Sequence, residues 1–171
     1  MAIYLQRHGE SETNKRKLYT CRRLDPGLSE TGVEQIRSKV SFYRDKNITR
    51  IISSPSRRAA ESASILSVGL GRSVEVDGDL LEVDLGDLEG QSELEETRLD
   101  YFFEVMEAWH SGSYAVRFLG GESGEEVLSR VARIQNRYFD MPGVILVGRL
   151  AFKACYCRVP DALSSPTAVG R

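Results

Sequence analysis

The sequence is short of cysteine and of long apolar runs, and both shortages narrow the class of protein. Only three of the 171 residues are cysteine. This odd number, in a chain large enough to form a core of its own, argues against a disulfide framework. No stretch approaches the roughly 20 apolar residues of a membrane span, and the first residues lack the charged and apolar regions of a signal peptide. We therefore expect a soluble, cytoplasmic protein that does not bind or cross a membrane.

An excess of either charge is also missing. The 23 basic and 25 acidic side chains leave a formal net charge of -2. Electrostatic binding to nucleic acid needs a basic excess, and the densest basic stretch, residues 15–23, is short. Hydrophobic residues at 41% and charged residues at 28% are ordinary globular values. The composition therefore indicates a folded protein without a nucleic-acid partner.

Residues that commonly bind metal ions are few. Cys155 and Cys157 are close in the chain, but they lack a nearby histidine or a second cysteine pair, which leaves a metal site incomplete. The sequence shows no cluster of histidine and aspartate ligands. We therefore expect no metal and no cofactor, and we interpret the three cysteines, Cys21 included, as buried or bystander thiols.

Short apolar runs alternate with segments of helical period, a pattern typical of a mainly parallel sheet covered by helices. The strands are expected at residues 2–6, 49–53, 73–76 and 143–147. A helix should follow Ser29, where apolar residues recur at spacings of three and four, and another should follow Pro55. Ser123 and Glu126 have the spacing of a capping box for a helix that extends to about residue 140.

The length of the chain favours one domain, with a lid inserted between the third and fourth strands. An aromatic-rich helix near residues 94–109 is the candidate lid. We expect its aromatic side chains to pack the lid against the sheet, although the same helix could also contact a substrate.

The most informative segment, Gln6-Arg7-His8-Gly9-Glu10, stands where the first strand should end. Ligands of open parallel sheets collect beyond the carboxyl ends of the strands, so we expect the arginine and histidine to face a binding site. Gly9 removes a side chain where a ligand would need backbone contact. Three further segments follow in order, at residues 53–59, 81–90 and 120–123.

Together these segments resemble the histidine phosphatase superfamily, the phosphoglycerate mutase-like proteins. An Arg-His-Gly-Glu motif is followed by Asn14, by Ser-Ser-Pro with a later Arg-Ala, by Leu-Glu with Glu-Gly, and by Gly-Gly-Glu-Ser. The resemblance extends from residue 3 to about residue 148. It implies an α/β fold, a three-layer α/β/α sandwich with a mainly parallel sheet and a small helical lid insertion at about residues 84–121. The whole chain, residues 1–171, would form a single domain of this kind.

The resemblance also implies roles for individual residues. His8 would be the nucleophile that accepts a phosphoryl group, and Glu82 the acid that protonates the leaving oxygen. Arg7, Arg58 and Asn14 would bind the substrate. The residue types suit these roles, because a neutral imidazole is a competent nucleophile and guanidinium groups match phosphate oxygens. We interpret the neighbouring Arg57 as outward-facing, and His110 as structural or exposed.

Arg149 stands where the family has its second catalytic histidine, after the fourth strand. An arginine can stabilise part of the charge that develops during phosphoryl transfer. A third guanidinium tightens binding of phosphate in ground state and transition state alike, and near Glu82 it would favour the ionised form of that acid. We therefore expect Arg149 to bind phosphate, with turnover reduced.

The resemblance favours a phosphomonoester hydrolase that acts on a small phosphorylated metabolite through a phosphohistidine at His8, because a short chain with a short lid is similar to the small phosphomonoesterases of the family. Its partner would be the phosphorylated substrate or inorganic phosphate. Two alternatives stay open, which are phosphoglycerate mutase-type transfer and a catalytically impaired module that binds a phosphate ligand. The sequence leaves the oligomeric state open.

Overall fold

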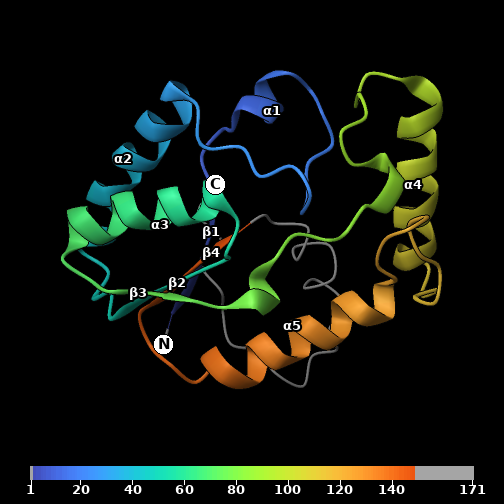
Figure 1. Ribbon diagram of the computed structural model, residues 1–171. Helices are drawn as coiled ribbons and strands as arrows, with labels where there is room; N and C mark the ends of the chain where they lie inside the picture. Colours follow the sequence, from blue (N-terminus) through green and yellow to red (C-terminus); the bar gives the residue numbers. More distant parts are fainter. Residues whose placement is uncertain (1, 149–171) are drawn as a thin grey trace.

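The computed structural model describes residues 2–148, and within them four strands form one parallel sheet (Figure 1). The strands are β1 (Ile3–Arg7), β2 (Arg50–Ser53), β3 (Val74–Val76) and β4 (Val144–Gly148). Their order in the sheet is β1-β4-β2-β3, and each pair of neighbours is parallel. The four predicted strands are therefore confirmed, and β4 is inserted between β1 and β2.

Five α-helices and two 3-10 turns surround the sheet in the described part of the chain. The α-helices are α1 (Glu12–Lys15), α2 (Glu30–Arg44), α3 (Arg57–Leu70), α4 (Glu96–His110) and α5 (Gly124–Tyr138), and the turns are η1 (Gly78–Leu80) and η2 (Gly86–Leu88). The predicted caps Ser29 and Ser123 precede α2 and α5, where their side chains accept main-chain N–H groups. Within residues 2–148, no helix combines the length and apolar character needed to cross a membrane.

The helices cover both faces of the sheet and so form the expected three layers. On one face, Tyr4, Ile51 and Ile145 pack with buried residues of α2 and α3. On the other face, Ile52 and Leu146 pack with α5. Neighbouring strand residues point to opposite faces, so a strand buried on both sides must be apolar throughout, as β4 is. Figure 1 shows α2 and α3 on one side of the sheet and α5 on the other.

The aromatic residues near α4 pack mainly on one another instead of on the sheet. Phe118 is fully buried, and Tyr101, Phe102 and Trp109 of α4 contact its ring with centroids 5.5–6.2 Å away. Phe102 also stacks on Tyr19. In the described residues, this core cluster contains side chains of α4, α5, η2 and the loops that follow α1, η1 and α4, and none from a strand. The prediction that these aromatics are packing residues is confirmed for Tyr101, Phe102 and Trp109, whereas Phe103 is 57% exposed. The predicted partner, the sheet, is wrong.

Candidate active site

The carboxyl ends of the central strands meet at one edge of the sheet. The His8 N–H donates to the carbonyl of Gly148, at the end of β4, over 3.2 Å. The Ser54 N–H, just past β2, donates to the carbonyl of Val147 over 2.9 Å. The residues after β1 and β2 are therefore adjacent, because parallel pairing places all strand ends on the same side.

The His8 ring is buried and held through both nitrogens. His8 is only 5% exposed. Nδ1 lies 2.7 Å from the carbonyl oxygen of Gly9, and Nε2 lies 3.3 Å from Nε of Arg58. A carbonyl can only accept and a guanidinium can only donate, so Nδ1 carries the proton and the lone pair of Nε2 faces Arg58. The contacts thus select one tautomer, with its basic nitrogen beside a cation.

Arg58, in the first turn of α3, is 1% exposed. Its Nη2 donates to the carbonyl of Cys21 over 3.1 Å, and its Nη1 lies 3.7 Å from Oδ1 of Asp25. A buried guanidinium needs such partners to offset the loss of hydration. Asp25, a residue that the sequence analysis did not select, therefore takes part in holding Arg58 beside His8.

The other predicted residues lie in different surroundings. Arg57 is exposed and pairs with Glu61 over 2.7 Å, as expected of an outward-facing residue. Arg7 is the exposed last residue of β1, opposite Gly148 in the strand register. Asn14 completes a capping box, in which its Oδ1 accepts from the N–H and hydroxyl of Ser11. The structure therefore brings His8 and Arg58 into contact and gives Asn14 a structural contact.

His110 and Arg149 are the remaining residues for which the sequence predicts a role. His110 is the half-buried last residue of α4. Arg149 lies outside the described residues, directly after Gly148 in the chain.

Glu82 lies in the loop after η1 and is 4% exposed. Its Oε1 accepts the N–H of Val83 over 2.9 Å, and its carbonyl accepts Nε of Arg22 over 3.2 Å. Arg22 follows Cys21, whose carbonyl is bound by Arg58. The dipeptide at residues 21–22 thus links the surroundings of His8 to those of Glu82.

Gly9 is needed for packing against α2, and this reason differs from the predicted one. A Cβ atom at Gly9 would lie 2.3 Å from the carbonyl oxygen of Gly32, in the first turn of that helix. A separation below 3 Å forces the backbone to move. The glycine therefore allows close contact between two main chains, whereas its place in the motif predicted that it makes room for a ligand.

One group of potential metal ligands occurs in the described residues, in which single atoms of Cys21, Asp84 and Glu89 lie within 4.8 Å of one another. Burial and a hydrogen bond with Glu89 raise the pKa of the Cys21 thiol to about 12. Oε1 of Glu89 already accepts the N–H groups of Cys21, Arg23 and Leu24, over 2.7–3.0 Å. These contacts fasten the loop at residues 21–24, and the thiol is held in its protonated form.

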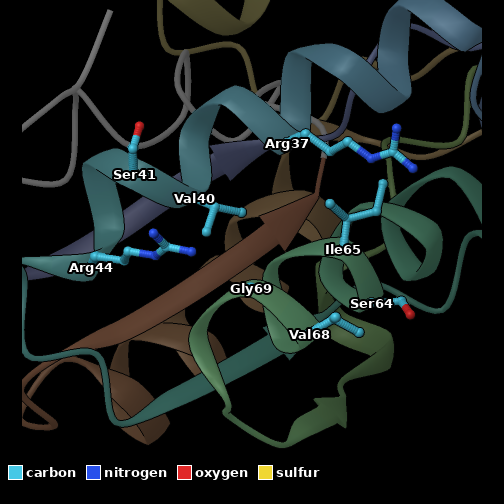
Figure 2. A pocket seen from close by; sticks show the side chains of 8 residues that line it. All are labelled: Arg37, Val40, Ser41, Arg44, Ser64, Ile65, Val68 and Gly69. Carbon is cyan, nitrogen blue, oxygen red and sulfur yellow. The ribbon is translucent and has the colours of Figure 1, made fainter.

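A groove of about 540 Å³ lies between α2 and α3, away from these residues (Figure 2). Arg37, Val40 and Arg44 of α2 face Ile65 and Val68 of α3 across it. No predicted site residue lines this groove. The candidate site is therefore the edge where the strands end.

Comparison with known proteins identifies the family of the chain. A model of the histidine phosphatase superfamily (branch 1) matches residues 3–146. Bifunctional protein Rv2228c of Mycobacterium tuberculosis is 34% identical over 136 residues, which are 79% of this chain and 36% of that protein. The probable phosphoglycerate mutase GpmB of Cronobacter sakazakii is 32% identical over 146 residues, which are 83% of this chain and 65% of that protein. The chain thus spans about a third of the mycobacterial relative and less than two thirds of the mutase-like one.

Solved structures are similar to the chain over most of its length. A mycobacterial glucosyl-3-phosphoglycerate phosphatase in complex with VO3 has 25% identity and a TM-score of 0.70, covering 90% of this chain and 77% of that one. A protein described as mycobacterial hydrolase 1 has 28% identity and a TM-score of 0.67, covering 85% and 73%. Because the family model matches most of the sequence and the fold agrees with these two structures, the chain belongs to the histidine phosphatase superfamily.

Proposed function

We propose that the chain is a phosphomonoester hydrolase that acts on a small phosphorylated metabolite through a phosphohistidine at His8. The observation that carries this proposal is the arrangement of one ring, with Nδ1 against the Gly9 carbonyl and Nε2 beside the buried Arg58. This arrangement supplies an unprotonated nitrogen and a permanent cation at one point, which suits attack on a phosphate ester. The similarity to a glucosyl-3-phosphoglycerate phosphatase supports the same reaction class.

In the first step, Nε2 of His8 forms a bond to phosphorus and the bond from phosphorus to the ester oxygen breaks. Glu82, in its carboxylic acid form, gives a proton to the leaving oxygen. The Val83 N–H binds Oε1, so that proton belongs on Oε2. Positive charge grows on the imidazole as the bond forms, and the Gly9 carbonyl that accepts from Nδ1 stabilises it. Arg58 and Arg7 would bind the phosphoryl oxygens, and Asn14 would help to bind the substrate.

In the second step, water replaces the histidine at phosphorus. The Glu82 carboxylate, left by the first step, takes a proton from the attacking water as the bond between nitrogen and phosphorus breaks. The products are inorganic phosphate and the original neutral His8, so the cycle is closed without any other reactant.

The remaining proposals concern the surroundings of this centre. The lid would be the insertion at about residues 84–121, carried by a single domain that includes the whole chain. Arg149 would follow β4 as a third guanidinium near the phosphate, because the residue before it accepts the His8 N–H. Such a cation would strengthen binding of substrate and of product phosphate, and would slow turnover.

Phosphoglycerate mutase-type transfer is a second candidate, favoured by the similarity to GpmB. A mutase must keep water away from the phosphohistidine and return the phosphoryl group to the bound intermediate. Measuring the products therefore separates the two activities, because a hydrolase releases inorganic phosphate and a mutase forms an isomer of its substrate.

The test is to trap the covalent intermediate. The protein is incubated with a 32P-labelled phosphomonoester and quenched, and the label should remain on the protein through alkali and be lost in acid, as phosphoramidates are. His8→Ala should abolish labelling, while His110→Ala should keep it. Phosphate binding without any labelling would overturn the proposed hydrolase function and would support a phosphate-binding module.

A further inference from the structure

Two guanidinium groups hold the main chain on both sides of Glu82. Arg22 donates from Nε to the Glu82 carbonyl over 3.2 Å. Arg130 donates from Nη1 to the carbonyls of Leu81 and Asp79, each over 2.8 Å. The backbone that carries Glu82 is therefore held from α5 and from the loop between α1 and α2.

Glu122 joins the two guanidinium groups. Its Oε1 lies 2.7 Å from Nη2 of Arg22, and its carboxylate accepts two hydrogen bonds from Arg130, over 3.0 and 2.7 Å. Its Oε2 also accepts the N–H of Asp84, and its own N–H donates to the Asp84 carbonyl. The side chains of Arg130 and Glu122 are only 10% and 13% exposed. We call Arg22, Glu122 and Arg130 the clamp.

The Glu122 carboxyl group of the clamp is ionised near neutral pH. Burial raises the pKa of Glu122, but the hydrogen bonds and charge of Arg130 and the N–H of Asp84 outweigh burial and lower it overall. An ionised carboxylate between two guanidinium groups makes strong, directional hydrogen bonds. These hydrogen bonds offset part of the desolvation cost of the buried charges and fix the three side chains relative to one another.

The clamp acts on the segment that sets the position of the Glu82 carboxyl group. That carboxyl binds the N–H of Val83, and the clamp holds the residues on either side, Glu82 and Asp84. A shift of about 1 Å in a reacting group can lower a rate by about 100-fold. Movement of this backbone would therefore reach the proposed proton donor directly.

We propose that Glu122 is a positioning residue for Glu82, holding the proton donor in place through Arg22 and Arg130. This inference rests on the proposed function. Neither Glu122 nor the two arginines need to touch the substrate.

The test uses the dependence of rate on the leaving group. An alkyl phosphate such as glycerol phosphate needs a proton on its leaving oxygen, whereas 4-nitrophenyl phosphate has a stable leaving anion. In Glu122→Gln, kcat/KM should fall by about 100-fold for the alkyl ester and by no more than about threefold for the aryl ester. Arg22→Gln should show the same selectivity in a milder form, because Arg22 is the most exposed member of the clamp.

Matched controls come from an exposed ion pair between neighbouring strands, in which Arg50 lies 3.5 Å from Glu75. Arg50→Gln and Glu75→Gln remove the same charges from an exposed pair on β2 and β3 and should leave both rates unchanged. Equal losses for the two esters in Glu122→Gln, or no loss at all, would overturn the positioning role.

Hydrogen exchange at the Val83 amide provides a readout without turnover, since the Glu82 carboxyl protects that amide. Exchange should be about tenfold faster in Glu122→Gln than in Glu75→Gln at equal global stability. Unchanged exchange in Glu122→Gln would overturn the positioning role, whether or not the wild-type chain hydrolyses either ester. A wild-type chain that hydrolyses neither ester would refute only the proposed function.

Discussion

Arg57 and Arg58 are neighbours in the chain, but only Arg58 reaches the site. Successive residues of a helix are about 100° apart around its axis, so adjacent side chains point in different directions. Arg58 shares its buried face of α3 with Ser62, whose hydroxyl accepts the N–H of Gly9 over 3.1 Å. The direction of one helical turn therefore decides which guanidinium faces His8.

Replacing Arg58 should affect hydrolysis far more than replacing Arg57. Arg58→Met removes the cation beside Nε2 of His8, and kcat/KM should fall by about 100- to 1,000-fold. Arg57→Met removes an exposed ion pair with Glu61 and should change the rate by less than about twofold. Steady-state hydrolysis of a phosphomonoester measures both, with circular dichroism to confirm folding. Similar losses in the two variants would contradict the assignment of Arg58.

Arg149→His should raise turnover and weaken inhibition by inorganic phosphate. A guanidinium stabilises the bound phosphate dianion of substrate and product as much as it stabilises the transition state. Its removal should therefore lower the free energy needed to release the product phosphate. We expect a higher kcat together with a higher inhibition constant for phosphate. Equal rates and equal inhibition before and after the substitution would contradict the proposed role of Arg149.

At the scale of elements, the loop that carries Glu82 is packed tightly against the turn before α5. A Cβ atom at Gly121 would lie 2.3 Å from the carbonyl oxygen of Asp84, and one at Gly86 would lie 2.0 Å from that of Leu119. Both glycines let the two loops approach through their main chains. This close contact places Glu122 within reach of the N–H of Asp84.

Gly121→Ala should therefore destabilise the fold, whereas Gly78→Ala should not. The added methyl group at residue 121 must push apart two backbones, at an expected cost of about 1–3 kcal/mol in the free energy of unfolding. A methyl group at Gly78 meets no atom within 4 Å. Urea unfolding of both variants measures the difference. Equal stabilities would show that the loops can move apart without cost.

At the scale of the whole molecule, several carboxyl groups with lowered pKa values make the stability of the fold depend on pH. Hydrogen bonds from Arg133 lower the pKa of Asp79. Burial raises the pKa values of Glu89 and Glu122, but their hydrogen bonds outweigh it and both pKa values are lowered. Each group therefore binds a proton less readily in the folded protein than in the unfolded chain, which stabilises the fold wherever the group is ionised.

The free energy of unfolding should be constant near neutral pH and decrease as the pH falls below the ordinary glutamate value of 4.5. In that range the unfolded chain takes up protons that the folded protein binds only at lower pH. Urea unfolding at several pH values measures the slope. Glu122→Gln should reduce it, whereas Glu75→Gln should not, and a flat profile for the wild type would contradict the linkage.

Local patterns in the sequence determined the four strands and the four longer helices, and they marked His8 and Arg58 of the candidate site. Apolar runs marked the four strands, and Ser29 and Ser123 marked helix starts, because period and capping depend on residues close together in the chain. The motifs around His8 and Arg58 predicted a phosphate site only through their resemblance to the histidine phosphatase superfamily, and their place after apolar strands predicted that it lies at the strand ends.

Only the tertiary structure decided how these segments are joined. It placed β4 between β1 and β2, packed the aromatic residues on Phe118 instead of the sheet, and connected Arg22 and Glu122 to the loop of Glu82. Residues 22, 82 and 122 are far apart in the chain, so no local period records their contact. Their meeting follows from the crossovers between parallel strands, which bring distant loops to one edge of the sheet.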